Sequence, residues 1–286
     1  QSVQKQQFEQ FCGMRLSTWK FLSSTGKGTS SGNADLTADQ PHILLLAGTF
    51  EARVLANKLL ERFPTVRLTA SFAGAVKDLP DLGVPTRIGG FGGVEGLCQY
   101  LQTEKVSLII DATHPFAAQM SRNAFHAAER EGVAILRLER PAWQQAPNDL
   151  WHPVASMDDA ADAIPDGAHA FLAAGRKEIA TFYRRGDIIG TARMIEPPPI
   201  PLPSHWSLML SRPPQSAEQE VELFQEKGIT HVVTKNSGGT RAYAKIEAAR
   251  QMQLPVIIVD RPELPSTDTA ATVNDVLDWT DRFLNT

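Results

Sequence analysis

Four short segments combine glycine, hydroxyl and charged residues in patterns that suit an anionic ligand. The first, Ala47-Gly48-Thr49-Phe50-Glu51-Ala52-Arg53, ends an apolar run. A strand that leads through a glycine into a helix exposes backbone N–H groups and the positive end of the helix dipole, which suit a pyrophosphate. Thr49 adds a hydroxyl group and Arg53 a cation. Because the G-x-G-x-x-G fingerprint is absent, a plain strand-to-helix turn is an equal alternative for this segment alone.

The second segment, residues 88–96, contains five glycines. Glycine costs conformational entropy, so such a run needs a reason. Close approach of the backbone to a flat or phosphorylated ligand is one reason, and a mobile loop is the alternative. The loop is expected at the same sheet edge as the first turn, which favours a shared ligand. The residues assigned to it here are Gly89, Gly90, Phe91, Gly92 and Gly93.

The third segment, Asp111-Ala112-Thr113-His114-Pro115-Phe116, closes a buried strand. It should place Thr113 and His114 at the carboxyl edge of a parallel sheet, where doubly wound folds bind ligands. His114 can donate a proton or hydrogen-bond a carboxylate or carboxamide. A histidine that only caps or packs is the alternative.

The fourth segment, Thr234-Lys235-Asn236-Ser237-Gly238-Gly239, is followed by Arg241 and Lys245. A polar, glycine-containing loop with three nearby cations suits carboxylates or phosphates. A solvated basic loop is the alternative. Arg176 and Arg193, each at a strand end, can join the same positive cleft, and Arg261-Pro262 closes the last strand in a similar position.

The elements that must position these segments alternate between strand and helix, which predicts parallel sheets built from right-handed βαβ units. We expect an α/β fold of two doubly wound, Rossmann-like halves with a cleft between them. Residues 1–40 form an expected flexible extension, 41–142 a dinucleotide-binding half, and 143–286 a second half that completes the cleft. Strands are expected near 42–47, 66–71, 86–88, 106–112, 134–138, 152–155, 170–174, 187–193, 207–211, 231–235 and 255–260. Helices are expected near 51–62, 94–102, 117–131, 157–164, 176–184, 216–227, 243–252 and 273–284.

The composition excludes several classes of function. A formal net charge of −4 over 286 residues argues against nucleic-acid and polybasic membrane binding. Two cysteines, Cys12 and Cys98, lack metal-ligand spacing and fit a reducing compartment such as the cytoplasm. Apolar runs are too short to span a bilayer. Hydrolase, zinc and Walker A motifs are missing.

Taken in order, the motifs resemble those of the precorrin-6A reductase family of cobalamin biosynthesis. They are G-T-F-E-A-R, G-G-F-G-G-V-E-G-L, D-A-T-H-P-F-A, R-L-E-R-P-x-W, G-R, T-K-N-S-G-G and V-D-R-P. The resemblance covers about residues 42–265, nearly all of the chain expected to be structured.

This resemblance implies an NADPH-dependent enzyme that reduces one double bond of the precorrin-6A macrocycle to precorrin-6B, without flavin or metal. The dinucleotide would lie against the first half, and the tetrapyrrole would enter the cleft; neighbouring pathway enzymes could receive the product. The implied catalytic residues are Asp111, His114 and Lys235, and the proton could come from His114, Lys235 or water. The implied cofactor residues are Gly48, Thr49, Arg53, Ser71, Lys77, Thr113 and the glycine loop. The residues expected to bind the carboxylates of the substrate are Arg176, Arg193, Lys235, Asn236, Ser237, Arg241 and Lys245.

The chain departs from the family pattern in two places. Similar proteins usually have Gly-Gly where this one has Ala47-Gly48, which a small side chain should tolerate. They commonly end the segment after the second strand in Ala-Gly-Arg, where this chain has Ala73-Gly74-Ala75. An arginine there is well placed for the 2′-phosphate of NADP, so Lys77 or Arg87 must take its role, and NADH stays open.

Two further functions remain open from the sequence. One is a cobalt-precorrin-6A reductase of the anaerobic branch that uses NADH, because the motifs are shared. The other is a non-catalytic tetrapyrrole- or dinucleotide-binding carrier, which the cationic loop would also suit.

Overall fold

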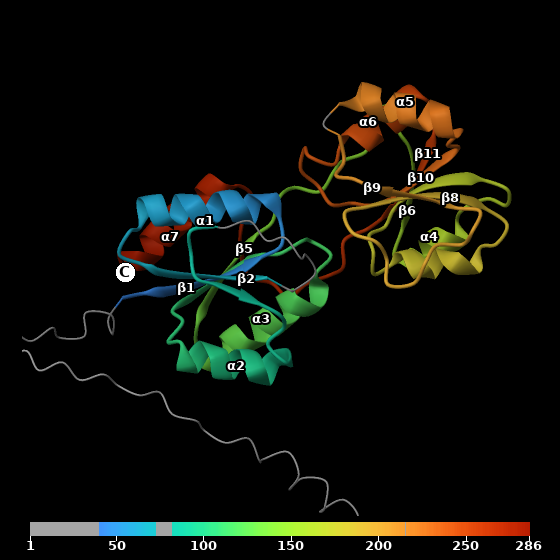
Figure 1. Ribbon diagram of the computed structural model, residues 1–286. Helices are drawn as coiled ribbons and strands as arrows, with labels where there is room; N and C mark the ends of the chain where they lie inside the picture. Colours follow the sequence, from blue (N-terminus) through green and yellow to red (C-terminus); the bar gives the residue numbers. More distant parts are fainter. Residues whose placement is uncertain (1–39, 73–81, 215) are drawn as a thin grey trace, which may run out of the picture. The chain divides into compact units, whose positions relative to one another are not determined.

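The structure, a computed structural model, describes residues 40–72, 82–214 and 216–286 (Figure 1). The expected N-terminal extension, with Cys12, lies outside the described residues apart from Gln40. The segment Ala73-Gly74-Ala75 and Lys77 also lie outside them.

The first half is a six-stranded parallel sheet in the order β12-β5-β4-β1-β2-β3. Helices α1 and α7 cover one face of the sheet, and α2 and α3 cover the other (Figure 1). The strands are β1 (His42–Ala47), β2 (Arg67–Phe72), β3 (Thr86–Ile88), β4 (Leu108–Ala112), β5 (Ala134–Leu138) and β12 (Asp268–Ala270). The helices are α1 (Phe50–Arg62), α2 (Gly93–Thr103), α3 (Ala118–Glu131) and α7 (Val273–Leu284).

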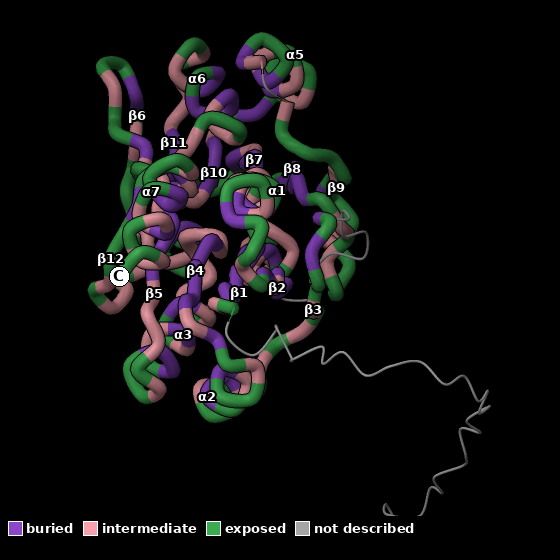
Figure 2. Tube along the Cα trace, turned by 90° about the vertical axis from the view of Figure 1, so that its left-hand side faces the viewer, coloured by how far each residue is buried: buried purple, intermediate pink, exposed green. Residues whose placement is uncertain are grey.

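Strand β1 shows why this half folds as three layers. Its six residues are all buried. Ile43 and Leu45 pack into the core under α1 and α7, whereas Leu44 and Leu46 pack into the core under α2 and α3. Side chains alternate between the two faces of a strand, so a continuous apolar run needs a hydrophobic layer on each side. Figure 2 shows the result, with buried strands and helices exposed on their outer faces.

The second half repeats this plan with the strand order β6-β11-β10-β7-β8-β9, again all parallel. Helices α5 and α6 lie on one face and α4 on the other (Figure 1). The strands are β6 (Leu150–Val154), β7 (His169–Ala173), β8 (Ile189–Met194), β9 (Ser207–Leu210), β10 (His231–Lys235) and β11 (Pro255–Val259). The helices are α4 (Met157–Asp162), the 3₁₀ helix η1 (Ile179–Arg184), α5 (Ala217–Lys227) and α6 (Ala244–Gln251). The expected α/β fold with two parallel sheets is confirmed.

At the end of the chain, the structure differs from the expectation that residues 143–286 all belong to the second half. Strand β12 pairs with β5, with Asp268 opposite Leu136, and therefore completes the first sheet. Helix α7 follows it and buries Val276 and Leu277 in the core of the first half. The strand was missed because three residues, Asp-Thr-Ala, carry no apolar periodicity.

The helix expected at 176–184 is also different, because only Ile179–Arg184 is helical and it is a 3₁₀ helix. Ile179 and Phe182, three residues apart, are both buried. In a 3₁₀ helix such residues lie directly above one another, so this tighter turn points both side chains at the core.

Candidate functional site

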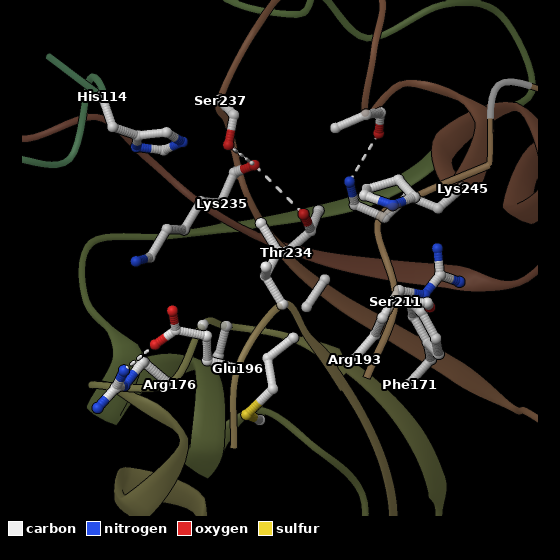
Figure 3. Close-up of a pocket in the computed structure, with 17 residues that line it drawn as sticks. His114, Phe171, Arg176, Arg193, Glu196, Ser211, Thr234, Lys235, Ser237 and Lys245 are labelled. Carbon is white, nitrogen blue, oxygen red and sulfur yellow. Dashed lines mark hydrogen bonds and ion pairs between the residues drawn. The ribbon is translucent and has the colours of Figure 1, made fainter. Parts of the chain in front are cut away.

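The carboxyl ends of the strands open onto a cavity of about 400 Å³ that residues of both halves line (Figure 3). The first half contributes His114, which follows β4. The second half contributes the ends of β7, β8 and β10 and the start of α6. The ionisable lining residues are His114, Arg176, Arg193, Glu196, Lys235 and Lys245. Most of the remaining lining is apolar, as is typical of small-molecule sites.

His114 is uncharged in this setting. Burial, together with the smaller effect of the nearby cations Arg140 and Lys235, lowers the pKa of its imidazole to about 3. The backbone N–H of Phe116 donates to Nδ1 over 3.3 Å, so the ring proton resides on Nε2. His114 can therefore donate a hydrogen bond from Nε2, but the imidazolium needed for easy proton donation is absent near neutral pH.

Two of the expected substrate-binding cations already hold carboxylates. Lys235 Nζ donates to Glu178 Oε1 over 2.8 Å and lies 5.3 Å from the ring centre of Phe116. Arg176 forms an ion pair with Glu196. An anionic substrate would have to share or replace these partners, which lowers the gain from each new ion pair.

Arg193 is buried deeper. Both of its terminal nitrogens donate to the carboxylate of Glu220 on α5. Its guanidinium lies 4.5 Å from the ring centre of Phe171, and its Nε has no hydrogen-bond partner among the described residues. A bidentate pair of this kind is a fixed part of the cavity wall.

Lys245, on the first turn of α6, is buried and also lines the cavity. Its Nζ donates to the carbonyl of Ala242 over 2.6 Å and lies 4.9 Å from the ring centre of Trp143. The pKa of its ammonium group is lowered to about 7, mainly by burial; Glu220 acts in the opposite direction, and Arg193 contributes to the lowering.

A second cavity, of about 180 Å³, lies at the turn between β1 and α1. It is lined by Gly48, Thr49, Phe50, Glu51, His114, Arg140, Gly238, Gly239, Arg241 and Ala242. Arg241 lies 3.4 Å above the ring centre of Phe50, so its cation belongs to this turn and does not line the larger cavity. His114 lines both cavities.

The turn itself is organised by Thr49. Thr49 is the N-cap of α1, and its hydroxyl accepts from the N–H of Ala52 and donates to the carbonyl of Ala112. Its hydroxyl hydrogen is therefore not available to a ligand. Arg53 is half-buried on the second turn of α1 and does not line this cavity.

The glycine loop is held by Arg87, a residue of β3. Its guanidinium donates to the carbonyls of Gly89 and Gly90 and to Oγ of Ser71, and it lies 3.7 Å from the ring centre of Phe91. Gly89, Gly92 and Gly93 have φ of 111°, 82° and 89°, which only glycine adopts readily. The backbone conformation therefore accounts for three of these glycines without a ligand.

Asp111 has a different place from the one expected of a catalytic residue. Its Oδ1 accepts from the N–H and the hydroxyl of Thr113, and its Oδ2 lies 3.6 Å from Nε of Arg137. It is buried and lines neither of the two larger cavities. Asp111 and Thr113 thus shape the turn that presents His114.

The chain passes between the two halves twice, in residues 139–149 and 260–267; these two segments are the crossings. Asn236 and its neighbours form hydrogen bonds with both. The amide of Asn236 accepts from the N–H of Trp143 and donates to its carbonyl. The carbonyl of Ser237 accepts from Arg140 and Arg261. Asn236 therefore faces the crossing chain, whereas Ser237 also lines the larger cavity.

Arg140 and Trp143 were not predicted as site residues, and Arg261 was predicted only to lie at a strand end near the cleft. The motifs R-P-x-W and V-D-R-P contain them, but nothing local in these motifs shows that their side chains meet the T-K-N-S-G-G loop.

No helix among the described residues is both long and apolar enough to cross a membrane. Within the same part of the chain, no cluster of three or more His, Cys, Asp or Glu side chains is arranged to hold a metal ion.

Two parallel sheets with ligand-sized cavities at their carboxyl edges define a Rossmann-like α/β protein. The description "Precorrin-6x reductase CbiJ/CobK" belongs to the family whose sequence profile matches residues 42–281. The chain belongs to this family of oxidoreductases.

Individual relatives agree with this assignment. A precorrin-6A reductase of Rhodococcus erythropolis is 43% identical over 240 residues, which are 83% of this chain and 96% of that protein. A cobalt-precorrin-6A reductase of Methanothermobacter thermautotrophicus is 30% identical and covers 93% of this chain and 92% of its own length. A solved structure of CobK precorrin-6A reductase superposes with a TM-score of 0.79 at 41% identity, covering 85% of this chain and 97% of that one.

Proposed function

We propose that this protein reduces one double bond of precorrin-6A to give precorrin-6B in cobalamin biosynthesis. Family membership and the 43% identity to a precorrin-6A reductase support the reaction. The structural observation that carries the proposal is His114, which lines both cavities. Ligands bound in the two cavities would meet at this side chain, as a hydride transfer requires.

The smaller cavity suits the pyrophosphate of a nicotinamide dinucleotide. A Cβ at Gly48 would lie 3.6 Å from the backbone nitrogen of His114, an ordinary contact, so the fold alone does not demand glycine there. The N-terminus of α1 and Arg241 both line this cavity, where they would face the pyrophosphate. When bound, the reduced dinucleotide supplies the hydride, and the protein binds and orients the reactants.

We further propose that the dinucleotide is NADPH and that Arg87 binds its 2′-phosphate. In doubly wound folds the ribose of the adenosine lies beyond the carboxyl end of the second strand. Arg87 lies at that edge and donates to Oγ of Ser71 on β2. Its remaining N–H groups can bind a phosphate oxygen.

The larger cavity suits one edge of the macrocycle. Its apolar lining can cover a pyrrole-type ring, and Lys235 and Arg176 can exchange their carboxylate partners for carboxylates of the substrate. The chain is 43% identical to a relative named for the metal-free substrate and 30% identical to one named for the cobalt substrate. This difference favours metal-free precorrin-6A as the substrate. A cytoplasmic location and transfer of the product to the next pathway enzyme belong to the same proposal.

The test is the loss of NADPH absorbance when substrate is added. We expect oxidation with precorrin-6A, and slower oxidation with cobalt-precorrin-6A or with NADH. Tight binding of precorrin-6A without any oxidation of NADPH would contradict the proposal and would favour a carrier. Faster turnover of the cobalt substrate with NADH would favour the anaerobic reductase instead.

Replacement of Arg87 tests the cofactor choice. We expect Arg87→Met to raise the KM for NADPH about tenfold or more, because a hydrogen bond to a charged group contributes about 1.5–3 kcal/mol. The KM for NADH should change little. Arg130→Met, which removes an exposed arginine paired with Glu95, is the matched control. Equal losses with both dinucleotides would show that Arg87 only holds the glycine loop.

A further inference from the structure

We propose that Lys245 is the acid that protonates the substrate during reduction. This inference rests on the proposed reductase function. It concerns the proton, for which the motifs offered only His114, Lys235 or water. Lys245 was expected only to bind a carboxylate of the substrate.

The position of Lys245 distinguishes it from the other cations of the cavity. It is buried and lines the cavity, yet none of the ion pairs formed by the described residues includes it. Its ammonium group donates to a backbone carbonyl, that of Ala242, over 2.6 Å (Figure 3). A carbonyl orients the group but does not neutralise it, so two N–H donors remain for a ligand.

The other ionisable groups of the cavity are poor proton donors. His114 is neutral, because its pKa is held at about 3. The ammonium group of Lys235 is already engaged by the carboxylate of Glu178. Arg176 and Arg193 are guanidinium groups, which keep their protons in proteins. The carboxylate of Glu196 is engaged by Arg176.

The surroundings of Lys245 make its ammonium group acidic enough for this role. Burial is the main cause that brings its pKa to about 7. Helix α5 packs on α6 and presents the buried carboxylate of Glu220, but Arg193 of β8 already holds this carboxylate. Strand β11, which also packs on α6, has no ionisable side chain. A general acid works best when its pKa lies near the working pH.

The chemistry balances with one proton from Nζ. Addition of hydride to one atom of the double bond leaves an electron pair on the partner atom. That atom takes a proton from the ammonium group of Lys245, so one N–H bond breaks and one bond from hydrogen to the macrocycle forms. The substrate gains two electrons and two hydrogens, the dinucleotide is oxidised, and the neutral amine regains a proton from water.

The central test is Lys245→Met, which keeps the length of the side chain and removes the acid. We expect kcat to fall about 10²–10⁴-fold, the usual contribution of general acid catalysis, while the KM for precorrin-6A and the Kd for NADPH change little. In the wild type, kcat/KM should decline above about pH 7, because this parameter follows the loss of the proton from the ammonium group in the free enzyme. Lys227→Met on the outer face of α5 is the matched control.

A second measurement needs no turnover. NMR titration of lysine-labelled free protein should show one side chain with a pKa near 7, and this signal should be missing in Lys245→Met. An ordinary lysine pKa for Lys245, or an unchanged kcat with a raised KM in the variant, would overturn the proposal. Absence of turnover in the wild type contradicts the reductase function itself, whereas equal kcat in wild type and Lys245→Met contradicts only the role of Lys245.

Discussion

Gly48 and Gly238 are glycines for different reasons. At Gly48 the backbone has no positive φ, and an added Cβ would make only ordinary contacts with residues 113 and 114. At Gly238 φ is +68°, and an added Cβ would lie 2.2 Å from the carbonyl oxygen of Pro141. The fold therefore requires Gly238, whereas only a ligand would require Gly48.

This contrast predicts opposite effects of the same substitution. Gly48→Ala should leave the melting temperature nearly unchanged but weaken NADPH binding about tenfold or more, because a methyl group would fill the space of the pyrophosphate. Gly238→Ala should destabilise the protein by roughly 1–3 kcal/mol through backbone strain and the clash with Pro141. Thermal unfolding and fluorescence titration measure the two effects. Unchanged NADPH affinity in Gly48→Ala would move the cofactor away from this turn.

The lowered pKa of His114 predicts how the stability of the protein depends on pH. An unperturbed histidine has a pKa of 6.5, whereas His114 in the fold has a pKa of about 3. Between these two pH values the unfolded chain therefore binds a proton that the folded chain does not bind. Stability contributed by the neutral ring is complete above about pH 6.5 and is lost as the pH falls toward 3, by at most about 1.4 kcal/mol per pH unit.

The variant His114→Asn should remove this loss. Its free energy of unfolding in urea should fall less between pH 6.5 and pH 5 than that of the wild type. His126→Asn, at an exposed position on α3, should behave like the wild type. The same acid sensitivity in His114→Asn and wild type would show that the ring is not held neutral.

At the scale of elements, the order of strands and helices was largely predictable. The bounds of β1, β3, β5, β10 and α7 match the expected ranges. Strand β1 is a continuous apolar run closed by Gly48, and α7 begins after the capping residue Thr272. The 3₁₀ helix η1 and the strand β12 were not predicted. Both are short, and packing against distant residues determines their geometry.

Helix α7 offers a test of whether the C-terminal residues belong to the first half. Thr272 and Asp275 form a capping box at its start, and α7 packs on α1, where Arg62 pairs with Asp278. Thr272→Ala should lower the free energy of unfolding by about 1 kcal/mol, because it leaves a helix N–H unsatisfied. Thr286→Ala, beyond the helix, is the control. Urea denaturation measures both, and an unchanged midpoint for Thr272→Ala would show that α7 adds little to the first half.

At the scale of the whole described chain, the T-K-N-S-G-G loop serves two purposes. It lines the larger cavity with Lys235 and Ser237, and it holds the crossing chain through Asn236. Arg261 of the second crossing donates to the carbonyls of Asn236 and Arg140, so the two crossings are bonded to one another. The residues that bind ligands and the residues that connect the halves are thus neighbours in the chain.

This arrangement predicts that a change at the connection reaches the cofactor. Asn236→Ala leaves the buried N–H of Trp143 without its acceptor, which should cost about 1–3 kcal/mol of stability. Because Gly238, Gly239 and Arg241 line the smaller cavity, NADPH binding should weaken as well. Calorimetry and fluorescence titration test both effects. A loss of stability with unchanged NADPH affinity would confine Asn236 to the connection.

The sequence by itself determined the local structure, the fold class and, through its motifs, the family. Apolar periodicity, capping residues and glycine positions act within a few residues, so they can be interpreted before the chain is folded. The same motifs placed His114 and Lys235 at the edge where the larger cavity lies.

Only the tertiary structure decided what each polar side chain does there. It showed that Asp111 bonds to Thr113, Asn236 to Trp143 and Arg193 to Glu220. It also showed that Lys245 is buried without a carboxylate partner among the residues that the structure describes. It also returned the end of the chain to the first sheet. The physical reason is that the charge and hydrogen-bond state of a group depend on burial and on partners far away in the sequence, which no local pattern specifies.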